Sequence, residues 1–312
     1  MNAIDEIKDF IKQLDTDTEI QENQECNGYK INLIIPEYKL AIRFLPLVLN
    51  SQGWSTVDFL HIPEMDRNIN LVKTEACEKE GYQLLTIFEN EWILPDKQSI
   101  WKSVIANKMH KNPIKIAARK CQLLELKDKK SNKRLREFFR DNHLQGSVAT
   151  GAIKFVLIYE GEIVSVMTFG RSRFHKDPVY ELIRFANKKG VSVMGAASRL
   201  LKAFERSYKP KKLVSYANRR WSDGGLYRTL GFKETHIAEP NYFYFKKGDI
   251  FELRSRNVFQ KHKLHKLLEF FDEKQTEQEN MFRHEYRRVF DCGNYVFQKD
   301  YPENIENSEG KE

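Results

Sequence analysis

The stretch that decides the fold of this chain is Tyr216-Ala-Asn-Arg-Arg-Trp-Ser-Asp-Gly-Gly-Leu-Tyr-Arg-Thr-Leu-Gly-Phe232. It reads as the end of a strand, a polar loop and a short helix. Gly231 then ends the helix, because glycine accepts the left-handed backbone of a helix terminus. The loop contains Arg219-Arg220-Trp221, a cationic and aromatic cluster of the kind that nucleic-acid surfaces use. The stretch therefore predicts a strand–loop–helix unit with a basic loop.

The composition of the whole chain limits which kinds of protein it can be. The chain has 312 residues, 41% of them hydrophobic, which is enough for two domains with cores. The formal charge of +8 favours a polyanionic partner. No apolar run approaches the roughly 18 residues of a membrane span, and the N-terminus lacks a signal-peptide core, so we expect a cytoplasmic protein without a membrane partner. The cysteines form no CxxC pair, which predicts reduced thiols and no zinc site: Cys26, Cys77, Cys121 and Cys292.

Hydrophobic periodicity predicts an α/β (α+β) protein that is made of several segments. Residues 1–110 read as a compact α/β unit with strands at 29–35, 40–44 and 82–88 and helices at 4–14, 71–80 and 99–108. The expected segments are then a basic linker and first strand (111–130), a second domain (131–250), a basic helical extension (251–299) and a disordered tail (300–312). Within the second domain the order is helix, hairpin, strand, glycine loop, helix, strand, helix, strand, ending with a strand at 242–245.

This order, together with Leu226-Tyr-Arg-Thr-Leu-Gly-Phe232, resembles the layout and closing motif of GNAT-type acyltransferases. The resemblance implies a GNAT-like domain that uses acetyl-CoA or another acyl donor. Such a donor needs backbone N–H groups at a helix N-terminus for its pyrophosphate. The loop Gly190–Ser198 supplies them, with cofactor-binding candidates Val193, Gly195, Ala196 and Ala197. Ser192 stands where the family usually has a basic or amide residue, so one phosphate contact is missing.

The catalytic candidates follow from the same resemblance. Tyr227 lies where such enzymes often hold a tyrosine near the sulfur leaving group, as general acid. Core packing of a short helix explains Tyr227 equally well. Glu181 and Arg184 lie on the strand before the glycine loop, and strict alternation places them on opposite faces. Either charge can serve catalysis, and a structural ion pair is the alternative.

The N-terminal segment resembles the nuclease domain of phage homing endonucleases related to very-short-patch-repair endonucleases, which have a restriction-endonuclease-like fold. The resemblance rests on segments such as Ile34-Ile-Pro-Glu37, Leu85-Thr-Ile-Phe-Glu-Asn-Glu-Trp92 and Asp291-Cys-Gly-Asn294. Active relatives hold a divalent metal with carboxylates. Here the corresponding positions carry neutral or cationic side chains: Asn32, Arg43, Asn50 and Gln52. We therefore predict a degenerate nuclease domain that binds no metal.

Basic stretches predict DNA as the partner. The candidate DNA-binding residues are Arg171, Arg173, Arg219, Arg220, Trp221, Lys261 and Lys263. A further basic stretch spans 127–140, and solvated helix faces are the alternative.

The first functional interpretation is a phage-type DNA-binding protein in the infected bacterial cell, with an inactive nuclease-like domain and a GNAT-fold domain that transfers an acyl-type group to a DNA base. A second is a non-catalytic DNA-binding protein, derived from a homing endonuclease, in a phage or host nucleoprotein complex with protein partners. A third is a protein or small-molecule N-acetyltransferase.

Overall fold

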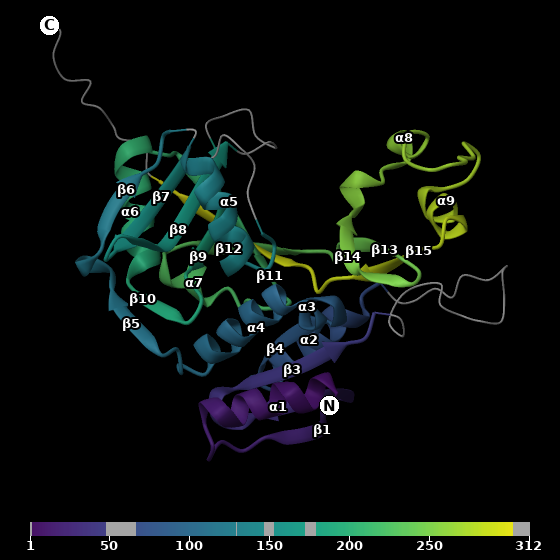
Figure 1. The fold of residues 1–312 in the computed structure, drawn as a ribbon, viewed down its shortest axis with the longest axis horizontal. Coiled ribbons are helices and arrows are strands. Elements are labelled where there is room, and N and C mark those ends of the chain that lie inside the picture. The colour runs from purple at the N-terminus through teal and green to yellow at the C-terminus, as the bar shows by residue number, and fades with distance from the viewer. Residues whose placement is uncertain (1, 48–66, 129, 147–152, 172–178, 302–312) are drawn as a thin grey trace, which may run out of the picture. The chain divides into compact units, whose positions relative to one another are not determined.

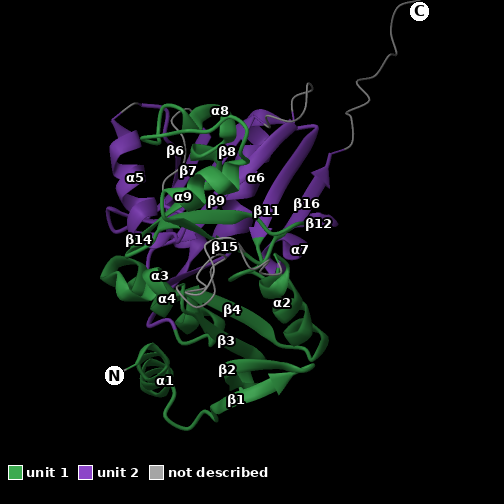
Figure 2. Ribbon diagram, turned by 90° about the vertical axis from the view of Figure 1, so that its right-hand side faces the viewer, with its two compact units in different colours: residues 1–111, 218–223, 238–294 green, residues 112–217, 224–237, 295–312 purple. Residues whose placement is uncertain are grey.

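The computed structural model describes residues 2–47, 67–128, 130–146, 153–171 and 179–301 (Figure 1). They form a mixed α/β protein, as expected. The chain divides into two compact units (Figure 2). Unit 1 comprises residues 1–111, 218–223 and 238–294, and unit 2 comprises 112–217, 224–237 and 295–312. Within the described segments, every helix is too short or too polar for a membrane span.

Unit 1 is built on a four-stranded sheet of order β1-β2-β3-β4, in which only the β3/β4 pair is parallel. Its strands are β1 (Gln21–Cys26), β2 (Tyr29–Ile35), β3 (Leu40–Leu45) and β4 (Gln83–Phe88). Its first helices are α1 (Ala3–Leu14), α2 (Ile69–Lys79), α3 (Glu89–Ile93) and α4 (Pro95–Lys108). The expected helices and strands of residues 1–110 are confirmed to within a few residues, whereas β1 and α3 were not expected.

A second, antiparallel sheet of order β14-β13-β15 completes unit 1. Its strands are β13 (Tyr242–Lys246), β14 (Asp249–Ser255) and β15 (Tyr286–Phe290). Within the basic extension, the sequence predicts one long helix from the stretch 254–266 to about residue 271, and this prediction is wrong: the chain forms only the short helix α8 (Lys261–Leu264) there. The helix predicted at 276–283, capped by Thr276, is confirmed as α9 (Glu277–Arg283). Apolar side chains on both sides of α8, such as Phe259 and Leu268, turn back onto the sheet and interrupt the helix.

Unit 2 is built on a seven-stranded sheet of order β12-β16-β11-β9-β8-β7-β6. Its strands are β6 (Gln122–Glu125), β7 (Ile153–Tyr159), β8 (Glu162–Arg171), β9 (Val179–Asn187), β11 (Lys212–Asn218), β12 (Lys233–Ala238) and β16 (Asn294–Asp300). The neighbouring strands from β6 to β9 pair antiparallel, whereas β9 and β11 run parallel. The expected closing strand at 242–245 is wrong for this sheet, because those residues pair within unit 1; β12 and β16 close it instead.

The described residues of unit 2 form the helices α5 (Ser131–Asn142), α6 (Ala196–Tyr208) and α7 (Gly225–Thr229). The apolar side of α5, with Phe139, packs on Val166 and Ala186 at one face of the sheet. The apolar side of α6, with Phe204, packs on Phe169 and Leu182 at the other. A separate parallel pair, β5 (Ile114–Ala117) with β10 (Val191–Met194), precedes α6. Residues 114–117 are therefore a paired strand within the segment expected to be a linker.

Candidate functional site

The strand β9 carries two of the catalytic candidates, and an irregularity in its pairing decides how they point. Gly170 of β8 lies opposite Glu181, and Thr168 lies opposite Arg184, so that Ile183 is an extra residue on β9. Because Thr168 and Gly170 share a face of β8, Glu181 and Arg184 share a face of β9. The expectation of opposite faces is wrong, since strict alternation does not survive a bulge.

The same strand pairs with its neighbour β11 over part of its length. In the described register of this parallel pair, the last partners are Ser215 and Leu182, although β9 continues to Asn187 and β11 to Asn218. The Ser215 hydroxyl closes the paired part by donating to the Leu182 carbonyl at 2.8 Å. Beyond this point the described register holds no further pairs of these two strands, so their backbone amides are suited to pair with an extended ligand that carries amides of its own.

Tyr227 reaches this region from α7. Gly224, with φ of +77°, begins the helix, and a Cβ there would lie 2.5 Å from Phe297. The Phe297 ring stacks on the Tyr227 ring with centroids 4.9 Å apart. Burial raises the pKa of Tyr227, while the Ser215 hydroxyl and the Arg184 charge oppose the rise. The phenol is therefore held protonated at neutral pH, as a proton donor must be.

Arg184 is the third catalytic candidate and follows the extra residue Ile183 on β9. Burial lowers the pKa of its guanidinium, and the nearby Glu181 and Tyr227 act in the opposite direction. One nitrogen donates to the Ile183 carbonyl at 2.8 Å, and the Nε atom has no partner among the described residues although it is buried. A buried donor without a partner is costly and is often found where a ligand completes the bonding. Glu181 and Arg184 thus share a face of β9, and the charges of both act on the Tyr227 phenol.

Tyr216 was missed by the sequence analysis as a site residue. It lies on β11, on the same face as Val214, which pairs with Glu181. Its side chain is 42% exposed, yet partial burial and the Glu181 carboxylate raise the pKa of the phenol. Only the structure could reveal this neighbour, because the pairing of β11 with β9 is not visible in the sequence.

The glycine loop opens onto a pocket at the start of α6. Gly195, with φ of +78°, caps this helix and lines an open pocket of about 490 Å³. The other cofactor candidates, Val193, Ala196 and Ala197, are buried. Their side chains pack in the core and support the loop, so only their backbone groups can contact an acyl donor.

Two arginines that the sequence analysis passed over line the same pocket: Arg119 and Arg199. Arg119 is exposed, and Arg199 in the first turn of α6 donates to the carbonyl oxygens of Ala118 and Cys121, the latter at 2.9 Å. Ser192 itself bonds to Asn112 at 3.0 Å. The β5–β10 pair therefore brings cations to the loop that lacks its own. The position of Arg199, directly after the glycine loop, was a signal in the sequence.

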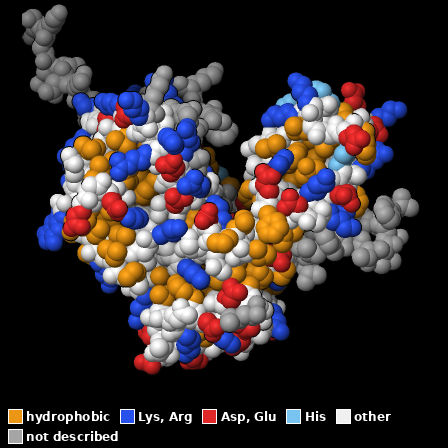
Figure 3. Space-filling model, in the orientation of Figure 1, with side chains coloured by type: hydrophobic (Ala, Val, Ile, Leu, Met, Phe, Trp, Pro, Cys, Tyr) orange, Lys and Arg blue, Asp and Glu red, His pale blue; other side chains and the backbone are white. Residues whose placement is uncertain are grey.

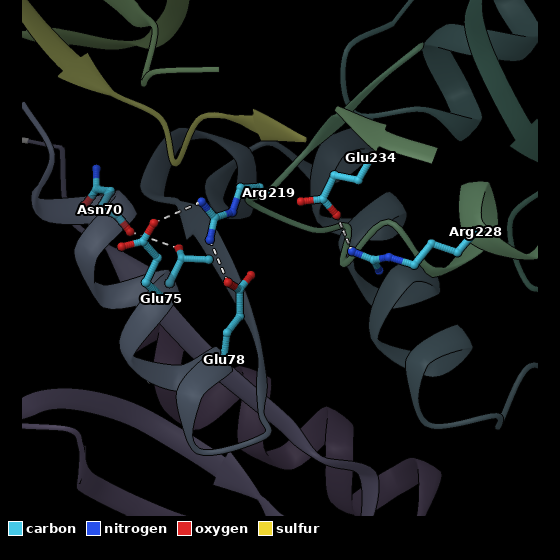
Figure 4. A network of polar contacts seen from close by, with 7 residues as sticks. Asn70, Glu75, Glu78, Arg219, Arg228 and Glu234 are labelled. Atoms are coloured by element: carbon cyan, nitrogen blue, oxygen red, sulfur yellow. Dashed lines mark hydrogen bonds and ion pairs between the residues drawn. The ribbon is translucent and has the colours of Figure 1, made fainter. Parts of the chain in front are cut away.

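Both arginines of the Arg219-Arg220-Trp221 cluster are buried and paired with carboxylates inside unit 1. Arg219 is 1% exposed and bonds to Glu78 at 2.6 Å and Glu75 at 3.5 Å, both on α2 (Figure 4). Arg220 is 4% exposed and holds the Glu91 carboxylate with two nitrogens, one at 3.2 Å. Both guanidinium groups are neutralised inside unit 1, so neither is available to a phosphate. The half-buried Trp221 ring packs edge-on against Trp101 with centroids 6.4 Å apart.

The remaining DNA-binding candidates stay predictions. Arg171 is exposed at the end of β8, and Arg173 lies outside the described residues. The exposed Lys261 donates to the carbonyl of Glu273 at 2.9 Å, and the half-buried Lys263 donates to that of Asn257 at 2.7 Å.

The degenerate nuclease positions are partly described. Asn32 of β2 accepts a bond from the Phe44 backbone of β3 at 2.9 Å. Arg43 is 5% exposed and donates to Asn70 at 2.5 Å. Asn50 and Gln52 lie outside the described residues. Across the described part of the chain there is no group of three His, Cys, Asp or Glu side chains that could hold a metal ion.

No protein-family model matches this sequence, and no curated protein does. Similar solved structures include a Bacillus subtilis acetyltransferase in complex with CoA, 12% identical, with a TM-score of 0.35, covering 59% of this chain and 100% of that chain. The ribosomal-protein-S18-alanine N-acetyltransferase of Escherichia coli is 11% identical, with a TM-score of 0.34 and coverages of 59% and 98%. A GNAT family acetyltransferase from Elizabethkingia anophelis with acetyl-CoA bound is 12% identical, with a TM-score of 0.31 and coverages of 58% and 99%. Likenesses of this degree assign no activity, so the functional argument rests on the geometry of unit 2.

Proposed function

We propose that unit 2 is an N-acyltransferase domain that uses acetyl-CoA or a similar acyl thioester. The observation that carries this proposal is that Glu181 and Arg184 share a face of β9 where its pairing with β11 ends, at Ser215, the residue that bonds to the Tyr227 phenol. A protonated phenol, a carboxylate and a cation in one half-buried place provide an acid, a base and an electrostatic anchor. Core packing alone would not require these polar groups to meet.

The residues at the start of α6 fit the phosphates of such a donor. The positive φ of Gly195 lets the chain turn into a helix of 13 residues, whose first N–H groups attract an anion. Arg119 and Arg199 line the same pocket and replace the charge that Ser192 does not supply. The edges of β9 and β11 beyond their paired part suit an amide-containing arm. When bound, the thioester would supply an activated acyl carbon and a thiolate leaving group.

The side chains of the cluster then divide the proton transfers between them. Glu181 accepts the proton that the acceptor amine loses as it attacks, and Arg184 favours the ionised carboxylate beside it. Tyr227 gives its proton to the departing sulfur, because its raised pKa keeps it protonated until that step. The proton balance is complete without a metal ion.

The test combines donor binding with thiol release. Acetyl-CoA at millimolar concentration should raise the melting temperature, and thiol release in the presence of amine acceptors should require Tyr227. Tyr227→Phe should keep the thermal shift and lose most of the turnover. Tyr208→Phe is the matched control, because this tyrosine lies on α6 and bonds to Glu125. Absence of any thermal shift, or equal turnover in the two variants, would count against the proposal.

For unit 1 we propose a non-catalytic module of nuclease descent. The observation that favours it is Arg43, a buried cation held by Asn70, at a position where the resemblance expects a carboxylate ligand. A positive charge there opposes the binding of a divalent cation. Purified protein should leave plasmid DNA intact with Mg²⁺ or Mn²⁺. Metal-dependent cleavage that is lost in Glu75→Gln or Glu89→Gln would overturn this assignment.

A further inference from the structure

One face of the unit 2 sheet carries features that the proposed chemistry does not use. Opposite pairs along β8 and β9 place Val166 with Ala186 and Gly170 with Glu181 on a single face. Helix α5 packs on Val166 and Ala186, so it covers part of the face from which Glu181 projects. Ala186 and Glu181 are about 16 Å apart along the strand at about 3.3 Å per residue. The part of the face that α5 covers and the candidate site are therefore neighbours along β9.

The outer side of α5 is a cationic ridge beside a hollow. Lys133, Arg136 and Arg140 recur at helical spacing and line, with Gln145 and Gly146, an open pocket of about 540 Å³. Glu137 lies among them, and Arg140 pairs with Asp141 at 2.8 Å. In the described part of the chain, neither Lys133 nor Arg136 forms an ion pair. Basic side chains interrupted by acidic ones are visible on this side of the molecule (Figure 3).

The length of the ridge suits a chain of phosphates. Positions 133 and 140 are seven residues apart, about 10 Å along a helix axis. That distance exceeds the reach of a single phosphate and is enough to contact more than one phosphate of a strand. A backbone of regularly spaced anions gains from several such contacts at once, because each one releases counterions.

Tyr216 adds an aromatic ring on which a base can stack. Its ring is 42% exposed on the same sheet face and lies beside Glu181. Exposed aromatic rings next to cationic surfaces stack on unpaired bases. An acidic peptide would use the ridge but would gain little from this ring, whereas a single strand of nucleic acid would use both.

We infer that this face binds a single-stranded nucleic acid, with its backbone on Lys133, Arg136 and Arg140 and one base on Tyr216. In combination with the proposed function, the stacked base would present its exocyclic amine to Glu181. Binding itself needs no donor, so it can succeed or fail independently of acyl transfer.

The test is fluorescence anisotropy with a labelled 20-nucleotide DNA strand over a series of salt concentrations. Replacing Arg136 and Arg140 by glutamine should weaken binding at least tenfold and lower the slope of log K against log salt by about 1.4, since each lost contact contributes about 0.7 for single strands. The control variant replaces Lys202 and Arg206, exposed cations of α6, which packs on the other face. It should bind like the parent protein.

Tyr216 provides a separate measurement. Tyr216→Ala should weaken binding roughly tenfold, whereas Tyr216→Phe should bind like the parent, because stacking needs the ring and not the hydroxyl. Equal losses in the α5 and α6 variants would show a non-specific charge effect and overturn the inference. A polyglutamate competitor that displaces the strand at equal charge concentration would assign the face to acidic peptides instead. Loss of donor binding with intact strand binding would remove the proposed function alone.

Discussion

Arg220, buried in unit 1, and Arg184, half-buried in unit 2, differ in how their charge is compensated. Arg220 holds both oxygens of Glu91, donates to the Thr86 carbonyl at 3.3 Å and stacks on the Phe88 ring at 3.5 Å. Arg184 bonds to its neighbour's carbonyl and keeps its Nε atom without a partner among the described residues. Full compensation indicates a structural role, and an incomplete set of bonds indicates a place for a ligand. Arg220 is therefore a structural arginine, whereas the bonding of Arg184 leaves room for the proposed ligand.

The largest expected effect concerns the structural arginine. Arg220→Met should lower the free energy of unfolding by about 3–5 kcal/mol, because it leaves the Glu91 carboxylate buried without its cation. Chemical denaturation measures this loss. The double variant with Glu91→Leu should be less destabilised than the sum of the single variants, although Trp101 then loses its acceptor, 3.0 Å away. A stable Arg220→Met protein that binds DNA more weakly would restore the surface role that the structure denies.

Most of the difference between Arg220 and Arg184 could not be predicted from the sequence. The strand–loop–helix unit at 216–232 could be predicted because its pattern is local, and β2 appears with the expected bounds. The burial of Arg220 could not be predicted, since its partner Glu91 lies 129 residues away in the chain. The register that brings Glu181 and Arg184 to one face depends on the extra residue Ile183, which fits because Gly170 has no side chain. Long-range pairing decided each of these points.

A substitution in the candidate site of unit 2 should affect catalysis rather than stability. Tyr227→Phe should reduce kcat about a hundredfold, the lower end of what a positioned general acid contributes. The loss reflects the missing proton donor, since the ring and its stacking on Phe297 remain. Steady-state thiol release measures it, and the KM for acetyl-CoA should stay within about twofold if the phenol acts on the chemical step. A raised KM with unchanged kcat would assign Tyr227 to binding instead.

The support of Tyr227 can be disturbed without touching its hydroxyl. Gly224→Ala should destabilise the protein by about 1–3 kcal/mol, because the new Cβ would meet the buried Phe297 ring in a left-handed backbone. Turnover should fall with stability, since Phe297 positions the Tyr227 ring. Gly248→Ala is the matched control, as its φ is also positive but no atom lies within 4 Å. Similar losses in both variants would mean that backbone strain alone is responsible.

Donor affinity should respond to the pocket cations. Arg119→Gln should raise the KM for acetyl-CoA about tenfold and leave kcat nearly unchanged, because a lost charge-assisted bond to a phosphate is worth about 1.5 kcal/mol. The control is Lys120→Gln, an exposed cation next in sequence that does not line the pocket. Dephospho-CoA and CoA compared by calorimetry would identify the phosphate concerned. If acetyl-CoA binds the parent and Arg119→Gln with equal affinity, Arg119 does not replace the charge that is missing at Ser192, and the donor site is weakened.

The smallest expected effect is a dependence of stability on alkaline pH. Burial raises the pKa of Tyr227 in the folded protein above the value of about 10 for a free tyrosine. The neutral phenol therefore contributes stability that is complete below about pH 10 and is lost as the pH rises through the folded pKa, since the unfolded chain ionises first. Urea denaturation at pH 8 to 11 should show the stability of the parent approaching that of Tyr227→Phe. Tyr208→Phe is the reference, because burial and Glu125 raise the pKa of Tyr208 to about 12. If the difference in the free energy of unfolding between the parent and Tyr227→Phe does not change with pH, the phenol of Tyr227 is not desolvated in the folded protein.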